Sequence, residues 1–196
     1  GPTATKNDDV EMDASPCPNL HGCQCINFDP TRLDCVGIGE ETLREMDTLY
    51  ANVKKLQIKD WSGERKLNLA SFNNLTKLET LAVTGDGVRS IQAAPLRRLR
   101  SLELRETRLS NWTEVCEVLS SLRSLESLDL TRGRIESMTS CKDEKASITL
   151  KRLTLAQNPM TTVEAVPSSI TSLDMSLTAV KELAQSALPP KLASLS

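Results

Sequence analysis

Six cysteines are the residues of this chain with the most distinctive chemistry. Four lie close together near the N-terminus and two lie in the second half: Cys17, Cys23, Cys25, Cys35, Cys116 and Cys141. Closely spaced thiols form either disulfides or a zinc site. The N-terminal group contains no Cys-x-x-Cys pair, and His21 is the one histidine of the chain, so we expect disulfides rather than zinc. Four cysteines allow three pairings, and their positions alone do not choose among them.

The remaining residues show no arrangement typical of an enzyme. With a single histidine, nothing resembles a Ser/His/Asp triad, and the sequence has no nucleophile elbow and no phosphate-binding loop. We therefore predict a protein that is not an enzyme and that holds neither a cofactor nor a metal.

A short apolar pattern recurs along the chain and forms the elements that must position these residues. It places apolar residues at its first, fourth and sixth positions and occurs at 53–58, 78–83, 99–104, 125–130, 150–155 and 170–175, with a seventh copy starting at Leu192. Alternation within Leu102-Glu103-Leu104 has a period of two, which indicates a short strand with one buried face. Such a strand cannot bury its leucines alone, so the copies must stack around a shared core. A further apolar residue follows most strands at a fixed offset and is expected to turn the chain back under the sheet: Val88, Leu109, Ile135, Met160 and Val180.

From residue 53 to the C-terminus this pattern resembles the leucine-rich repeat family. We predict an α/β fold, a leucine-rich repeat solenoid with a parallel β-sheet on its concave face. The four N-terminal cysteines resemble the disulfide-stapled N-terminal cap of extracellular members of that family. The resemblance implies the pairs Cys17–Cys25 and Cys23–Cys35, and it implies that ligands bind to the concave face.

One position departs from the family pattern. Where the family usually has asparagine after the strand, this chain has Trp61, Asp86, Thr107, Gly133, Asn158 and Thr178. Only Asn158 matches, and Gly133 has no side chain to satisfy the buried backbone groups of the turn. We therefore expect uneven repeats.

Three parts follow from this organisation. Residues 1–15 are polar and acidic after a Gly-Pro that looks like the remnant of a cleaved tag, and they are expected to be disordered. Residues 16–50 form the cap, and residues 51–196 form six repeats and a truncated seventh. The sequence shows no membrane span and no signal peptide. Because extracellular members commonly end in a second cysteine-rich cap, we expect a fragment of a longer ectodomain; the alternative is self-association through the uncapped C-terminal strand edge.

The other two cysteines occupy nearly the same place in adjacent repeats. Cys116 follows Leu102 by 14 residues and Cys141 follows Leu128 by 13. Neighbouring strands are about 4.8 Å apart, which suits a disulfide, so we predict a Cys116–Cys141 bridge. The alternative is two free buried thiols. With this bridge all six cysteines are paired, as expected in an oxidising compartment.

Two N-glycosylation motifs agree with such a compartment. They begin at Asn74 and Asn111, outside the expected strands. We predict an extracellular or cell-surface glycoprotein, the ectodomain of a single-pass membrane protein.

The residues between the strand leucines are expected to form the binding surface. Charge concentrates in the third and fourth repeats, and the predicted ligand-binding residues are Lys59, Glu103, Arg105, Glu106, Asp129 and Arg132. The alternative is a solvated face whose charges serve solubility.

A basic run offers a second candidate surface. Arg97, Arg98, Arg100 and Arg108 are candidate contacts for a sulfated glycan, because arginine binds sulfate and phosphate through paired donors. The alternative is a solvated basic face.

The charge balance narrows the partners. With 24 basic and 26 acidic residues the net charge is −2, which gives no reason to expect nucleic acid or an anionic membrane as partner. We predict a protein-recognition module of a cell-surface receptor or adhesion protein that binds a protein ligand or co-receptor. The alternatives are a matrix protein or proteoglycan core that binds glycosaminoglycans, and an innate-immune pattern-recognition receptor.

Overall fold

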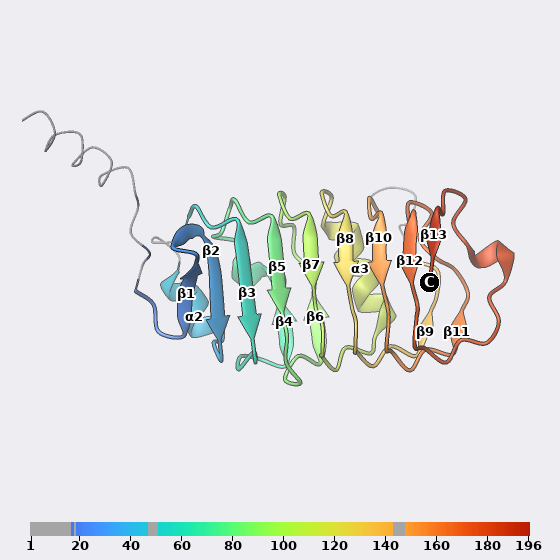
Figure 1. The fold of residues 1–196 in the computed structure, drawn as a ribbon, viewed down its shortest axis with the longest axis horizontal. Coiled ribbons are helices and arrows are strands. Elements are labelled where there is room, and N and C mark those ends of the chain that lie inside the picture. The colour runs from blue at the N-terminus through green and yellow to red at the C-terminus, as the bar shows by residue number, and fades with distance from the viewer. Residues whose placement is uncertain (1–16, 18, 47–50, 143–147) are drawn as a thin grey trace, which may run out of the picture.

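A computed structural model describes residue 17 and residues 19–46, 51–142 and 148–196, so the expected disorder of residues 1–15 lies outside the described residues. Its main element is a nine-stranded sheet (Figure 1), whose strands in spatial order are β1 (Cys23–Ile26), β2 (Asp29–Val36), β3 (Lys55–Lys59), β5 (Thr80–Val83), β7 (Ser101–Glu103), β8 (Ser127–Asp129), β10 (Arg152–Thr154), β12 (Ser172–Asp174) and β13 (Ser194–Leu195). Strand β1 pairs antiparallel with β2, and every later pairing in this sheet is parallel. The predicted parallel solenoid is confirmed.

The strand register follows the sequence pattern. The first strand leucine of each repeat lies beside its equivalent in the next, which gives the column Leu56, Leu81, Leu102, Leu128, Leu153, Leu173 and Leu195. The column continues into the cap, because Leu33 of β2 pairs with Leu56. From Leu33 to Leu173 these side chains are at most 1 % exposed. The cap is thus one more layer of the same stack.

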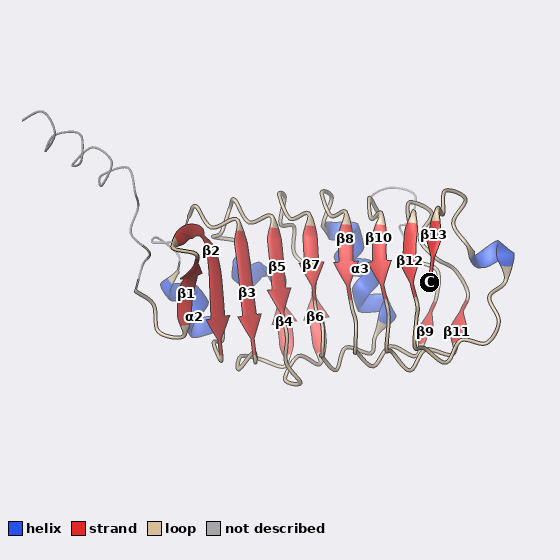
Figure 2. Cartoon of the chain, viewed as in Figure 1, coloured by secondary structure: helices blue, strands red, loops and turns tan. Residues whose placement is uncertain are grey.

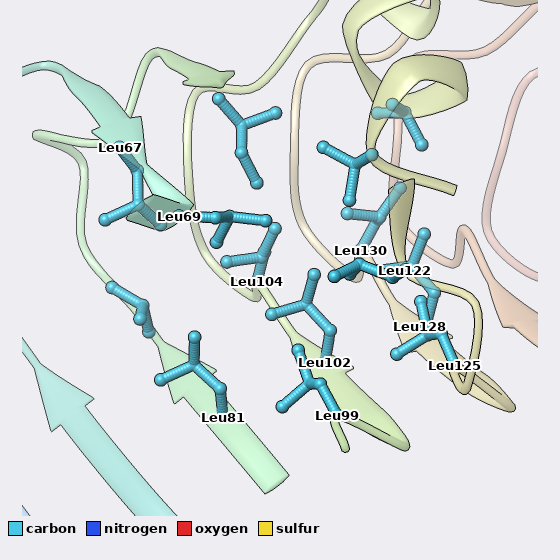
Figure 3. Packing of buried hydrophobic residues seen from close by; sticks show 14 of the residues in the cluster. Leu67, Leu69, Leu81, Leu99, Leu102, Leu104, Leu122, Leu125, Leu128 and Leu130 are labelled. Atoms are coloured by element: carbon cyan, nitrogen blue, oxygen red, sulfur yellow. The ribbon is translucent and has the colours of Figure 1, made fainter. Parts of the chain in front are cut away.

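Shorter elements lie behind and beside the large sheet, and α2 and α3 cover one side of it (Figure 2). They are α2 (Glu40–Glu45), η1 (Leu69–Phe72), α3 (Trp112–Ser121), η2 (Gln185–Ala187), and the strands β4 (Lys66–Asn68), β6 (Ser90–Gln92), β9 (Ser137–Met138) and β11 (Thr162–Val163). The leucines stack between these elements and the sheet (Figure 3). The turn-back residues Val88, Leu109, Ile135 and Met160 are buried, and Val180 is partly buried against the core.

Helix α3 is positioned by contacts at its N-terminal end. Asn111 caps it, because its Oδ1 accepts hydrogen bonds from the backbone N–H groups of Thr113 (2.9 Å) and Glu114 (3.3 Å). Trp112 is buried and its Nε1 donates to the carbonyl oxygen of Thr139 at 2.9 Å, which ties the helix to the next repeat.

The three disulfides of the structure are Cys17–Cys25, Cys23–Cys35 and Cys116–Cys141. The first two are the pairs that the family resemblance implies. The third joins adjacent repeats across a Cα–Cα distance of 5.4 Å, and it is the bridge that the repeat spacing predicts. Bonds of this kind belong to an oxidising compartment.

The turn at Gly133 is completed by a side chain of the following repeat. Gly133 does lack a bonding side chain, yet the turn is satisfied by Asn158 of the following repeat, which is only 2 % exposed. The Nδ2 of Asn158 lies 2.8 Å from the carbonyl oxygen of Leu130, and its Oδ1 accepts from the backbone N–H of Ile135 at 3.1 Å. A Cβ on Gly133 would lie 2.8 Å from that Oδ1, so the missing side chain is what lets Asn158 reach across.

Candidate functional site

The outward face of the nine-stranded sheet carries the candidate binding residues. Strand pairing places Gln57, Ala82, Glu103, Asp129, Thr154 and Asp174 in one column along this face. Cap strand β2 extends the face, because Arg32 pairs with Lys55 and Asp34 pairs with Gln57. The sequence reasoning missed these two residues, although the alternation Arg32-Leu33-Asp34-Cys35 is the same period-two signal that marks the repeats.

An ion pair connects the third and fourth repeats on this face. Arg105 Nε lies 3.5 Å from Asp129 Oδ2, with side-chain exposures of 51 % and 23 %. The other oxygen of Asp129 accepts from the backbone N–H of Thr131 at 2.9 Å and from its hydroxyl. Asp129 is therefore held from two sides, while neighbouring Glu103 is paired with it in register and is half-buried.

A second set of side-chain contacts between repeats runs along the edge of the sheet where the strands end. Arg132 Nη1 lies 3.1 Å from Glu106 Oε1, and Arg132 Nε donates to Gln157 Oε1, so three successive repeats are joined. Glu106, Arg132 and Gln157 have φ of 57°, 60° and 60°, in the left-handed region that costs an ordinary side chain about 1–2 kcal/mol. The same position in the last full repeat holds Leu177, which has φ of 56° and is 78 % exposed. Spacing alone gave no signal of this strain.

Not all predicted contacts come together. Lys59 ends β3 beside Val36 of the cap, and β5 separates it from β7, where Glu103 lies. In the column after the strands, Thr131 and Ala156 are only 5 % and 7 % exposed and offer little surface. The compact part of the predicted site is Glu103, Arg105, Glu106, Asp129 and Arg132.

The four arginines predicted as one glycan site are divided by the fold. Arg97, Arg98 and Arg100 precede β7, and Arg108 follows it, so they lie at opposite edges of the sheet. The first three line a hollow with Arg123 and Lys151, whereas Arg108 lines a different one with Arg134 and Glu136. The expectation of a single cluster is wrong, because the parallel strand carries the chain from one edge to the other between residues 100 and 108.

Electrostatics at the cap hairpin are local. The side chain and the backbone N–H of Thr31 both donate to Asp29 Oδ1, and they hold the pKa of the Asp29 carboxyl below its usual value.

Over the described ranges, no group of three or more His, Cys, Asp and Glu side chains is arranged to hold a metal. Among the helices of the same ranges, none has both the length and the apolar character needed to cross a membrane.

Both glycosylation motifs are accessible. Asn74 and Asn111 are exposed, and the Oδ1 of Asn111 is the atom that caps α3, which leaves Nδ2 for a glycan. We expect both to be glycosylated when the chain is secreted by eukaryotic cells, each adding a glycan that an N-glycosidase removes. The matched controls are Thr76→Ala and Thr113→Ala. Each removes one motif but keeps its asparagine, and each is therefore expected to lower the mass of the protein by one glycan. An unshifted wild-type mass contradicts the prediction.

No family model matches the chain. It is 26 % identical over 169 residues to the immunoglobulin domain and leucine-rich repeat-containing protein 2 of Caenorhabditis elegans, covering 85 % of this chain and 21 % of that protein.

Two solved structures share less. A TLR13–ssRNA13 complex has a TM-score of 0.43 at 14 % identity, covering 81 % of this chain and 30 % of the other. An internalin (InlF) from Listeria monocytogenes has a TM-score of 0.20 at 12 % identity, covering 84 % and 86 %. The recurring leucine pattern, its in-register parallel sheet and its disulfide-bonded N-terminal layer give this chain the fold of a leucine-rich repeat solenoid.

Proposed function

We propose that the chain is a protein-recognition module, part of the ectodomain of a cell-surface receptor or adhesion protein, and that it binds a protein ligand on the outward, concave face of its sheet. The observation that carries this proposal is the charged group on the third and fourth repeats. Four of its five members make contacts between repeats, Arg105 with Asp129 and Arg132 with Glu106. A surface whose charged side chains are already ordered loses less conformational freedom when a partner binds.

One column of this face is acidic, although Arg32, Lys55 and Arg152 in the neighbouring column make the face as a whole mixed in charge. Glu103, Asp129 and Asp174 share one column, and Arg105 is engaged with Asp129. Glu103 and Asp174 make no ion pair within the described part of the chain. A ligand that presents basic side chains along its contact surface is complementary to this column.

Two observations support the extracellular setting. All six cysteines are in disulfides, which persist in oxidising compartments. The C. elegans relative joins leucine-rich repeats to an immunoglobulin domain by its name, and many cell-surface proteins contain that kind of sandwich. The chain spans about a fifth of that relative, so a single-pass anchor and the role of the whole protein belong to this proposal.

A binding panel tests the proposal. The chain is presented to purified extracellular domains, a second copy of itself among them, and binding is measured by biolayer interferometry. We expect a ligand whose affinity falls at least tenfold on Glu103→Arg, because a basic partner then meets a like charge. The matched control is Glu117→Arg, an exposed residue of α3, which lies on the opposite side of the sheet from Glu103. It makes the same charge change and is expected to leave binding unchanged.

Two results would overturn the proposal. One is a panel in which no domain binds the wild-type chain. The other is a ligand that Glu117→Arg weakens as much as Glu103→Arg does. Thermal melting of all three proteins by circular dichroism verifies that each is folded.

A further inference from the structure

The edge of the sheet where the parallel strands begin, here called the strand-start edge, carries a strongly basic hollow of about 680 Å³. Five cations line it from three successive repeats: Arg97, Arg98, Arg100, Arg123 and Lys151. Glu79 and Glu126 also line it, so five positive charges face two negative ones in a chain whose net charge is −2. The hollow is thus a local excess of positive charge on a slightly acidic protein.

The cations of this hollow are available for a ligand. All five side chains are exposed. Within the residues described, none of them takes part in an ion pair, since the two ion pairs of the structure lie on the sheet face and at the strand-end edge. Backbone contacts nevertheless fix their spacing, because the N–H of Arg100 donates to the backbone carbonyl oxygen of Glu79 and that of Lys151 donates to the carbonyl oxygen of Glu126.

Hydroxyl groups at the same edge hold the loops that carry these cations. Ser124 Oγ donates to the carbonyl oxygen of Arg97 at 2.7 Å, and Thr149 Oγ1 donates to that of Leu125 at 2.8 Å. Ser169 Oγ repeats the contact in the next repeat, to Leu150 at 2.6 Å. These three contacts connect the loop backbone of four successive repeats, which limits the reorganisation needed when an anion binds.

The composition of the lining selects the class of ligand. Every lining residue is charged or bears a hydroxyl, and none is aromatic or aliphatic. Protein interfaces centre on buried aromatic and apolar anchors, and single-stranded nucleic acids stack their bases on aromatic rings; this hollow offers neither. What it offers is guanidinium groups, which bind sulfate through paired donors. A linear polyanion that reaches several repeats matches the arrangement.

We propose that the strand-start edge is a binding site for sulfated polysaccharide of the glycosaminoglycan class, with Arg97, Arg98, Arg100, Arg123 and Lys151 as its contacts. The site lies outside the charged group of the sheet face, so it is a second surface and stands independently of the protein ligand proposed above. It replaces Arg108 of the sequence-based set with Arg123 and Lys151, which the sequence places 23 and 51 residues after Arg100.

The test uses immobilised heparin and two triple variants with equal loss of charge. Arg97→Ser, Arg98→Ser and Arg123→Ser alter the hollow, while Arg89→Ser, Arg108→Ser and Arg134→Ser remove three exposed arginines elsewhere. We expect wild type to elute above physiological salt, the first triple to bind at least tenfold more weakly and the second to stay near wild type. The slope of log affinity against log salt should fall by about two to three in the first triple alone, since each contact releases about one counterion.

Chemically desulfated heparin and hyaluronan separate sulfate recognition from attraction to any polyanion. Binding of wild type to native heparin and to neither control supports the proposal. Equal loss in the two triples, elution of wild type below physiological salt, or undiminished binding to hyaluronan would overturn it. Binding of an acidic protein to this edge with no heparin retention would also overturn it, in favour of a protein site.

Discussion

Replacing Asn158 with alanine is expected to lower the free energy of unfolding by about 3 kcal/mol, because it leaves several buried backbone groups without partners. The Asn158 side chain bonds the carbonyl oxygens of Leu130 and Leu155, and it accepts from the N–H of Ile135. Each buried group left unsatisfied costs about 1–3 kcal/mol. Urea unfolding followed by far-ultraviolet circular dichroism measures the change.

A double-mutant cycle with Gly133 tests the reason for this effect. Gly133→Ala places a Cβ 2.8 Å from Asn158 Oδ1 and should destabilise the protein on its own. In the Asn158→Ala background the new methyl group has no amide to displace, so its cost should largely disappear. Additive effects of the two substitutions would contradict the contact across the repeats. Asn73→Ala, an exposed asparagine of the same chain, serves as the control and should change stability little.

Removing the Cys116–Cys141 bridge is expected to cost about 3 kcal/mol, since it closes a loop across 25 residues of chain. The double variant replaces Cys116 and Cys141 with alanine. Serine is not used, because both positions are only 7 % exposed and two serine hydroxyls would be buried there. The bridge joins α3 to the repeat that follows, so amide hydrogen exchange should accelerate most in residues 112–121.

Thiol titration supplies the control for this experiment. Unreduced wild-type protein denatured in guanidinium should contain no free thiol, and the single variant Cys116→Ala should contain one. A titratable thiol pair in wild type, or an unchanged unfolding midpoint in the double variant, would contradict the prediction. The Cys23–Cys35 bridge of the cap stays intact in every protein compared.

The sequence predicted the architecture well because the repeat is a direct physical signal. Strands such as β7 and β8 bury every second residue, so alternation in Leu102-Glu103-Leu104 carries both the strand and its register. The same reasoning located Cys116 and Cys141 in equivalent positions of adjacent repeats.

What the sequence did not predict depends on contacts between repeats and on backbone conformation. Arg97 and Arg108 are 11 residues apart, but a strand runs between them and places them at opposite edges. Glu106 and Arg132 have left-handed φ although neither residue type favours it. The role of Asn158 was visible only in part, because the turn that it completes belongs to the preceding repeat.

The contact between Gly133 and Asn158 also bears on how this array can change length during evolution. Each repeat of such an array is one structural unit that buries its apolar face against its neighbours, so the loss of one unit brings new neighbours together. Losing the repeat that carries Asn158 would bring the repeat of Thr178 beside Gly133. The Thr178 hydroxyl donates to Met175 O within its own turn, and the buried carbonyl of Leu130 would have no donor. In this part of the array, the repeat of Gly133 and the repeat of Asn158 can therefore be gained or lost without breaking this contact only when they are gained or lost together.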